Sequence, residues 1–168
     1  MRIPTRYLIG LVVLATASLL GRGSGSPEAL RVRRVIDGDT ITLQDGRTVR
    51  YIGIDTPETR RRVGQQWVSD PEPYGRAATQ ENARLIKGRD VRLEYDVQTH
   101  DRFGRLLAYV YVATPEGREV MVNEELLRRG YAQPLTIPPN VKYAERFRLV
   151  SEEARTARRG LWSWGREP

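Results

Sequence analysis

Apolar and polar residues alternate over several short segments between residues 30 and 112. Residues 40–43 alternate strictly, Asp45-Gly46 then supplies a hairpin turn, and residues 48–54 form the returning segment. A period of two places one face of a strand against a core and leaves the other face polar. The pattern therefore predicts β-strands throughout this part of the chain.

Two further segments extend the series of strands. Residues 91–97 keep the period of two, and residues 106–112 are apolar and rich in β-branched and aromatic side chains. Five strands are therefore expected. A helix is predicted to interrupt the series over residues 74–87, with Gly88 as its stop signal.

Two more helices are expected after the last strand. Asn123 is the predicted N-cap of the first, which has acidic residues in its first turn, basic residues in its last turn and Gly130 after its end. The second follows residues 138–140 and ends at Gly160. Its predicted apolar face comprises Tyr143, Phe147, Val150, Ala154 and Ala157, with Leu161 and Trp162 packed back onto the domain. Strands and helices in this order, without a long βαβ alternation, predict a mainly β protein with α-helices, built as a small, partly open Greek-key barrel.

The chain contains no cysteine and a single histidine, His100. Disulfides, thiolate nucleophiles, zinc sites built on sulfur and clusters of several histidines are therefore excluded. Any bound metal must have oxygen ligands, which suits hard cations such as calcium or magnesium. The apolar fraction of 39% over 168 residues is enough for one domain with a core of moderate size. His100 is expected to be a surface or turn residue.

Residues 1–26 are interpreted as a separate targeting segment. Arg2 and Arg6 precede an apolar run over residues 7–20, and Ala15-Thr16-Ala17 offers a small-residue cleavage pattern. A signal peptide is expected, with an uncleaved membrane anchor or a buried N-terminal helix as alternatives, so the protein would be secreted or held at the cell envelope. After a Gly/Ser spacer, residues 27–168 form the predicted domain. Its 25 basic and 21 acidic residues give a mild bias toward nucleic acid.

Three short stretches carry the candidate chemistry. Residues 35–40, Val-Ile-Asp-Gly-Asp-Thr, place two carboxylates around a glycine, although this composition also suits an ordinary turn. Residues 50–58 end a strand in an Asp-Thr-Pro-Glu turn, which Pro57 stiffens. Because strict alternation puts Arg50 and Asp55 on opposite faces, both serve one site only if Asp55 lies beyond the strand end. Residues 101–105, Asp-Arg-Phe-Gly-Arg, would alone fit a charged hairpin.

Together with the helix start Val122-Asn123-Glu124, these stretches resemble the staphylococcal nuclease family, also called thermonucleases. The resemblance runs from about Val35 to Trp162. It implies a five-stranded oligonucleotide-binding fold (OB-fold, a Greek-key barrel) with three helices. It also implies a calcium-dependent nuclease that hydrolyses phosphodiester bonds of DNA and RNA, prefers single strands and leaves 3′-phosphates. No protein partner is implied, and a monomer is expected.

The resemblance assigns a metal site to the acidic stretches. Asp39 and Asp55 would bind calcium through carboxylate oxygens, and Thr56 would bind it through its backbone carbonyl. Asp37 would lie close by as an outer acidic partner. Waters and a phosphate oxygen would complete the ligand shell.

Three further residues would act on the substrate. Glu58 would accept a proton from the attacking water or orient it, while Arg50 and Arg105 would donate hydrogen bonds to the phosphate. A phosphodiester already bears a negative charge, so attack by water needs cations on its nonbridging oxygens and one activated nucleophile. Planar guanidinium groups suit those oxygens better than an ammonium group does.

The chain departs from the family's best-known member where substrate would be contacted. Tyrosines that stack on a base in that member are replaced by residues 135–139, Leu-Thr-Ile-Pro-Pro, and Phe103 stands at a tyrosine position. Residues 59–73 form a longer predicted loop, to which substrate contact could have moved. Its Arg60-Arg61-Arg62 run is either a solvated basic loop or a phosphate contact, and Trp67 either anchors the loop or stacks on a base.

Two other functions fit the same fold class. The alternative to the enzyme is a non-catalytic nucleic-acid-binding OB-fold module, in which the acids or the arginines are usually lost. A peptide-binding scaffold would need an aromatic cage and an appended domain, and neither is evident in the sequence. The joint presence of acids and arginines therefore favours a nuclease.

Overall fold

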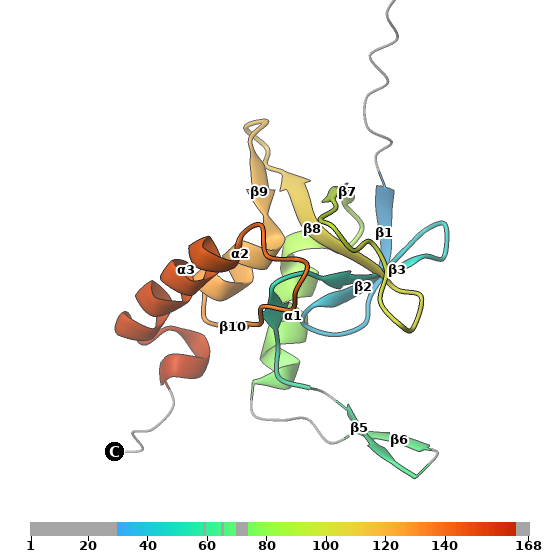
Figure 1. Ribbon diagram of the computed structural model, residues 1–168, viewed down its shortest axis with the longest axis horizontal. Helices are drawn as coiled ribbons and strands as arrows, with labels where there is room; N and C mark the ends of the chain where they lie inside the picture. Colours follow the sequence, from blue (N-terminus) through green and yellow to red (C-terminus); the bar gives the residue numbers. More distant parts are fainter. Residues whose placement is uncertain (1–29, 59, 65, 70–73, 164–168) are drawn as a thin grey trace, which may run out of the picture.

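The computed structural model describes residues 30–58, 60–64, 66–69 and 74–163, which form the elements shown in Figure 1. In chain order these are β1 (Leu30–Val35), β2 (Thr40–Leu43), β3 (Thr48–Tyr51), β4 (Ile54–Asp55), β5 (Arg60–Val63), β6 (Gln66–Ser69), α1 (Gly75–Ile86), β7 (Asp90–Glu94), β8 (Leu106–Ala113), β9 (Glu119–Met121), α2 (Val122–Arg128), β10 (Gln133–Pro134), α3 (Ala144–Thr156) and a 3-10 helix, η1 (Gly160–Ser163). The predicted targeting segment lies outside the described residues. Among those described, no helix combines the length and apolar character that a membrane crossing requires.

Five strands close into a barrel. The sheet runs β3-β2-β1-β7-β8, and β3 also pairs with β8, which closes it. The closing pair is parallel, whereas the other neighbours in the barrel are antiparallel. β9 extends the sheet from the edge of β8. The protein thus has the five-stranded barrel and the three helices that the sequence predicts.

The alternation seen in the sequence separates the inside of the barrel from its outer face. Ile41, Leu43 and Val49 are buried, while Thr42 and Thr48 between them are half-buried and lie on the outer face. Buried residues of the other strands and the helices complete one core. Its largest fully buried members are Tyr51, Tyr109, Phe147, Ile41, Leu43, Ile54, Ile86, Leu126 and Leu127.

The returning strand is shorter than predicted, because β3 ends at Tyr51 rather than continuing to residue 54. Gly53 has a φ of 79° and turns the chain, which resumes as β4 and pairs with β10. A Cβ on Gly53 would lie 2.6 Å from the ring of Phe147, so both the backbone conformation and the space require glycine. The prediction of one strand over residues 48–54 was therefore wrong at its end.

The first two helices lie where the sequence predicts them, but one cap differs. Gly88, with a φ of 70°, follows α1 as expected. Asn123 is not the N-cap of α2, because Met121 takes that position. The Asn123 side chain is instead buried, where it accepts a hydrogen bond from the backbone of Val110 and donates one to the carbonyl of Ile52, each over 2.9 Å. A buried amide needs such partners, and here they come from the barrel.

The third helix covers the barrel through only part of its predicted face. Phe147, Val150 and Ala154 are buried, whereas Ala157 is exposed because α3 ends at Thr156. After the helix, the backbone of Leu161 donates to the carbonyl of Gly130, and Trp162 lies half-buried beneath the Arg155 guanidinium. The chain therefore packs back onto the domain as predicted.

Residues 60–64 and 66–69, the described part of the predicted loop over residues 59–73, are not a simple loop. β5 and β6 form an antiparallel hairpin, which Figure 1 shows projecting away from the barrel. The side chains of Arg60, Arg61, Arg62 and Trp67 lie outside the described part of the structure. Both interpretations of each side chain therefore stay predictions.

Candidate active site

The loop between β1 and β2 carries two of the candidate carboxylates, those of Asp37 and Asp39. The backbone N–H of Asp39 donates to Asp37 Oδ1 over 3.1 Å, which tightens the loop. A Cβ on Gly38 would lie 2.5 Å from Thr56 Oγ1, so only glycine permits this approach. The Asp-Gly-Asp stretch is thus shaped to lie against the turn after β4.

Asp39 is fully buried, and both of its carboxylate oxygens are held. Oδ2 accepts hydrogen bonds from the backbone N–H of Thr56 over 3.0 Å and from its hydroxyl over 3.1 Å. Oδ1 accepts one from the Thr40 hydroxyl over 3.1 Å and also contacts the Arg50 guanidinium. A buried carboxylate is tolerated only with such hydrogen bonds and an opposite charge.

Arg50 joins the two acidic stretches. Its Nη1 contacts Asp39 Oδ1, and its Nη2 lies 2.6 Å from Asp55 Oδ1. Asp55 reaches this position because β3 ends at Tyr51 and the chain turns at Gly53, so Asp55 does not follow the alternation of β3. The condition set by the sequence, that Asp55 must lie beyond the strand end, is met. Two carboxylates therefore converge on one guanidinium group.

Asp37 lies beside the same positive charges. Burial raises the pKa of its carboxyl, and this effect outweighs the lowering by the hydrogen bond from Thr40 and by the charges of Arg50 and Arg105. The structure thus places Asp37 near both candidate catalytic arginines. The outer acidic role that the resemblance implied for Asp37 stays a prediction.

A buried side chain on α1, that of Asn82, supports the Asp37–Asp39 loop, and it was not predicted from the sequence. The side-chain amide of Asn82 donates to the carbonyl of Asp37 over 3.0 Å and accepts a hydrogen bond from the Tyr51 hydroxyl over 2.9 Å. Asn82 is fully buried, on the helix face that also buries Ala78 and Leu85. An amide at helical spacing between buried apolar positions is the signal that could have identified it.

Arg105 is held by its own loop. Asp101 Oδ2 accepts from Arg105 Nε over 2.6 Å, and Asp101 Oδ1 accepts from the backbone N–H groups of Phe103 and Arg105. Burial would raise the pKa of Asp101, but these hydrogen bonds outweigh it and hold that pKa below its usual value. The Arg105 Nη groups make no hydrogen bond within the described part of the chain. They therefore remain available as donors to a ligand.

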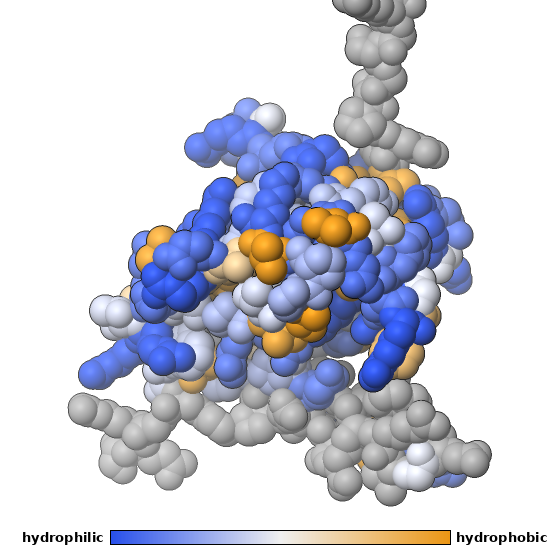
Figure 2. Space-filling model, in the orientation of Figure 1, coloured by the Kyte–Doolittle hydropathy of each residue, from blue (hydrophilic) through white to orange (hydrophobic). Residues whose placement is uncertain are grey.

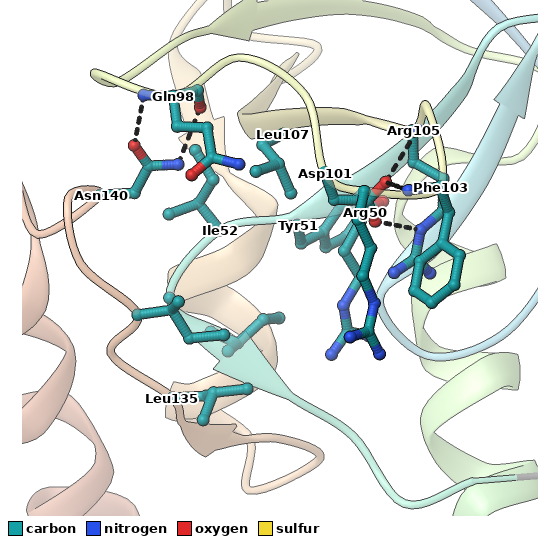
Figure 3. Close-up of a pocket in the computed structure, with 14 residues that line it drawn as sticks. Arg50, Tyr51, Ile52, Gln98, Asp101, Phe103, Arg105, Leu107, Leu135 and Asn140 are labelled. Atoms are coloured by element: carbon teal, nitrogen blue, oxygen red, sulfur yellow. Dashed lines mark hydrogen bonds and ion pairs between the residues drawn. The ribbon is translucent and has the colours of Figure 1, made fainter.

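Both arginines line one cavity of about 480 Å³. Figure 3 shows Arg50, Asp101, Phe103 and Arg105 at one end, with both guanidinium groups extending to the same side. The rest of the wall is mostly apolar or amide in character. The complete lining is Arg50, Tyr51, Ile52, Gly53, Ile54, Gln98, Asp101, Arg102, Phe103, Arg105, Leu107, Leu135, Ile137 and Asn140.

A pair of amide contacts fixes the far end of the cavity. The backbone N–H of Gln98 donates to Asn140 Oδ1, and Asn140 Nδ2 donates to the carbonyl of Gln98, each over 2.8 Å. Leu135 and Ile137 contribute exposed aliphatic groups to the same cavity wall. Figure 2 shows apolar side chains on the face that carries the segment between β10 and α3, surrounded by hydrophilic ones. This end can accept a flat apolar group.

Glu58 and His100 lie apart from this lining. Glu58 is exposed, and its backbone carbonyl abuts Gly75 at the start of α1, where a Cβ would collide with it. It follows Asp55 by three positions on the same turn. His100 is exposed and contacts the Thr99 hydroxyl over 3.0 Å, as expected of a surface residue.

The donor set fits a hard cation with few protein ligands. Within the described ranges, no group of three or more histidine, aspartate or glutamate side chains could hold a metal ion. Asp39 and Asp55 nevertheless share one cationic group, and Asp37 adds a third carboxylate to the same region. Arg50 brings one positive charge to the two carboxylates that it contacts, so the site can accept a divalent cation with two carboxylate ligands and further oxygens from backbone, water or substrate.

Comparisons with known proteins point to one family. The family model described as "Staphylococcal nuclease homologue" matches residues 48–164. The Thermonuclease of Staphylococcus hyicus is 39% identical over 146 residues, which cover 85% of this chain and 80% of that protein. Endonuclease YncB of Bacillus subtilis (strain 168) is 40% identical over 134 residues, or 77% of this chain and 59% of YncB. The Thermonuclease of Staphylococcus intermedius is 38% identical over 138 residues, or 80% of this chain and 76% of that protein.

Proposed function

The chain belongs to the staphylococcal nuclease family and is a nuclease, and we propose that it hydrolyses phosphodiester bonds of DNA and RNA with calcium as its metal. One observation carries the proposal. Asp39 and Asp55 converge on Arg50, and Arg50 and Arg105 line the same cavity. This arrangement combines an anionic site for a cation with guanidinium donors for a phosphate.

Asp39, Asp55 and the backbone carbonyl of Thr56 would hold the calcium ion, which supplies a Lewis acid for a nonbridging oxygen of the phosphate. The anchoring of Asp39 by Thr56 supports this role, because it keeps one ligand in place before substrate binds. Calcium suits the site better than zinc or copper, since cysteine is absent and the one histidine is at the surface.

The two arginines and Glu58 have different roles in the proposed reaction. Arg50 and Arg105 donate hydrogen bonds to the phosphate oxygens as charge develops, and Asp101 keeps Arg105 oriented through Nε. Glu58 accepts a proton from the water whose oxygen attacks phosphorus in line with the leaving group. The bond from phosphorus to the 5′ oxygen breaks, and that oxygen leaves as a hydroxyl after it takes a proton from solvent. The other product carries a 3′-phosphate.

The cavity supports a preference for unpaired strands. Its volume of about 480 Å³ is within the usual range for small-molecule sites, so it can hold a nucleotide-sized group. Its apolar wall at Leu135 and Ile137 would contact a base that is not stacked on its neighbours, and a base unstacks most easily in a single strand.

We further propose that residues 1–26 direct the protein to export, and that it acts as a monomer.

The function is tested with the full chain, denatured DNA and RNA, and either calcium or a chelator. Glu58→Gln and Arg105→Ala are measured beside the parent. Glu153→Gln on α3 and Arg118→Ala beside β9 serve as matched controls, because both side chains are exposed and distant in the fold from the cavity. Circular dichroism and thermal unfolding confirm that each variant is folded.

The expected result is calcium-dependent cleavage that both site variants lose and both controls keep. Removal of one phosphate donor typically costs about a hundredfold or more in rate. Binding of nucleic acid without cleavage in calcium, magnesium or manganese would instead identify a non-catalytic binding module. Full activity in Glu58→Gln would remove the proposed role of that carboxylate.

A further inference from the structure

We propose that the outer face of β1, β2 and β3 forms a second phosphate site, in which Arg34 holds the backbone of the substrate strand after it leaves the cavity. The inference rests on the proposed function and extends it, because it names where a longer strand binds. The occupant is the phosphodiester backbone of single-stranded nucleic acid. Arg33, which precedes Arg34 in β1, is exposed on the same surface.

Strand register places Arg34 on the face that carries Arg50. Arg34 pairs with Thr42, and Thr42 pairs with Thr48 on the other side. In the next row, Thr40 pairs with Arg50. Side chains of directly paired residues lie on one face, as do residues two apart along a strand. The two arginines therefore belong to one continuous surface, whose strands lie side by side in Figure 1.

The distance between the two arginines suits a strand that runs across the sheet. Neighbouring strands are about 4.8 Å apart, and residues two apart along a strand are separated by about 6.6 Å. Arg34 lies two strands and one such step from Arg50. Their Cα atoms are therefore separated by about 12 Å, a span that a small number of nucleotides covers.

A β-bulge directs two of the three arginines of β1, Arg33 and Arg34, outward. The register with β2 shifts between Val32 and Arg34, so Arg33 is the extra residue. Val32 is buried, Val35 is half-buried against the core, and Arg33 and Arg34 between them are exposed. The bulge thus presents two adjacent guanidinium groups where a regular strand would present one.

Among the residues that the structure describes, no acidic side chain pairs with these two guanidinium groups. In the same part of the barrel, Arg31 pairs with Asp90 and Arg47 pairs with Asp45. The side chains of Arg33 and Arg34 form no hydrogen bond or ion pair within the described part of the chain. Guanidinium groups without an acidic partner, on a surface next to a phosphate site, are complementary to a polyanion.

Threonines separate Arg34 from the Arg50 end of this face, where the carboxylates of Asp37 and Asp39 lie beside Thr40. These are Thr42 and Thr48, and both are half-buried with hydroxyls that can donate to a phosphate oxygen. The cavity itself has room for little more than one nucleotide. A longer strand must therefore continue over the protein surface, and this face offers cations and neutral donors along the way.

The test measures how cleavage depends on substrate length. The full chain in calcium is given oligothymidylates that range from a dinucleotide to a decanucleotide. Parent, Arg34→Ala and Arg33→Ala are compared with Arg118→Ala, an exposed arginine in the turn before β9. In the parent, kcat/KM is expected to rise with length until the strand reaches β1. Arg34→Ala should lower kcat/KM about three- to tenfold on the decanucleotide and less than about twofold on the dinucleotide, with kcat unchanged.

A second measurement keeps the test independent of cleavage. Binding of labelled decathymidylate is followed by fluorescence anisotropy in chelator at several salt concentrations. Loss of one phosphate contact lowers the salt slope by about 0.7 for a single strand. Equal losses on short and long substrates, or an unchanged salt slope in Arg34→Ala, would overturn the second phosphate site. A parent that cleaves no substrate would overturn the proposed function, while the salt slope would still decide whether Arg34 binds the strand.

Discussion

The carbonyl oxygen of Asp37 accepts a hydrogen bond from the side-chain amide of Asn82 over 3.0 Å, although 45 positions separate the two residues. Asn82 also accepts a hydrogen bond from the Tyr51 hydroxyl, whose pKa is raised well above its usual value by burial. The hydroxyl therefore stays protonated and remains a donor. Through these two bonds, α1 and β3 jointly set the position of the loop that carries Asp39.

Replacement of Asn82 by alanine should both destabilise the protein and weaken calcium binding at the proposed metal site. The change leaves the Tyr51 hydroxyl and the Asp37 carbonyl without partners, at a cost of about 1–3 kcal/mol for each buried group. Urea unfolding measures the stability, and calcium titration by calorimetry measures the affinity. Gln80→Ala, an exposed position on the same helix, is the control. Unchanged calcium affinity in a destabilised Asn82→Ala would show that the hydrogen bonds of Asn82 stabilise the fold but do not affect the metal site.

Arg50 and a divalent cation should compete for the same carboxylate oxygens. In the structure, the Arg50 guanidinium contacts both Asp39 and Asp55. Arg50→Ala leaves the buried Asp39 carboxylate without its counter-charge, so the variant should be less stable in chelator by about 3 kcal/mol or more. Calcium should then raise its melting temperature by more than it raises that of the parent. Equal shifts in the two proteins would contradict the competition.

The local part of the fold and the site could be predicted from the sequence. Period-two alternation identified β2 and β3 because one side of a barrel strand faces the core. The acids of the Asp-Gly-Asp and Asp-Thr-Pro-Glu stretches were assigned to a metal site through the resemblance to the nuclease family, because the Asp-Gly-Asp composition alone also suits an ordinary turn. The contact between Arg50 and Asp55 could be predicted on one condition, that Asp55 lies beyond the end of the strand. The turn at Gly53 meets this condition.

The remaining features depend on contacts between distant segments. Asn123 is predicted as a helix cap from its neighbours, yet it bonds to Ile52, 71 positions away. The pairing of Gln98 with Asn140 spans 42 positions. Local propensity contains no information on such pairs, because barrel closure and helix packing decide which polar groups become buried together. The hairpin of β5 and β6 is a local pairing, and it was nevertheless expected to be a loop.

Asp101→Asn should lower activity through Arg105 without disrupting the loop. The variant keeps an acceptor for the backbone N–H groups of Phe103 and Arg105 but loses the charge that holds Arg105 Nε. A mispositioned phosphate donor is expected to lower kcat about tenfold or more, with a smaller change in thermal stability. Steady-state kinetics on a short oligonucleotide checks this. A kcat equal to that of the parent would show that Phe103 and the backbone suffice to hold Arg105.

The protein should lose stability in acid through carboxylates that link β7 and its following loop to the segment before α3. Burial would raise the pKa of Glu94 and Asp96, but hydrogen bonds outweigh it and lower both values. These bonds come from Lys142 and Tyr143 to Glu94, and from the Lys142 backbone and Tyr109 to Asp96. An acid with a lowered folded-state pKa stabilises the protein above its unfolded-state pKa, and this contribution is lost as pH falls through the folded value.

The free energy of unfolding should therefore decline from about pH 5 downward. Asp96→Asn should reduce that decline, because its amide still accepts a hydrogen bond but no longer titrates. Urea unfolding across a pH series gives the comparison, with Glu153→Gln on α3 as the control acid. If Asp96→Asn follows the parent at every pH, the stabilising contribution of Asp96 does not arise from its ionisation.

An aromatic ring on the apolar wall of the cavity should strengthen binding of single strands. Leu135 and Ile137 line this wall, and both are exposed, so a larger side chain can be accommodated without repacking the core. Aliphatic groups bury a base edge or face through contact area alone, whereas a ring adds stacking worth about 1–3 kcal/mol per base. Ile137→Tyr should therefore lower KM for an oligothymidylate several-fold and leave kcat nearly unchanged, because Leu135 of the same wall lies away from Arg50 and Arg105 in Figure 3. The same substitution at Val141, which is exposed but outside the cavity lining, is the control. If Val141→Tyr lowers KM equally, the gain comes from a general surface contact, and the cavity is not where the base binds.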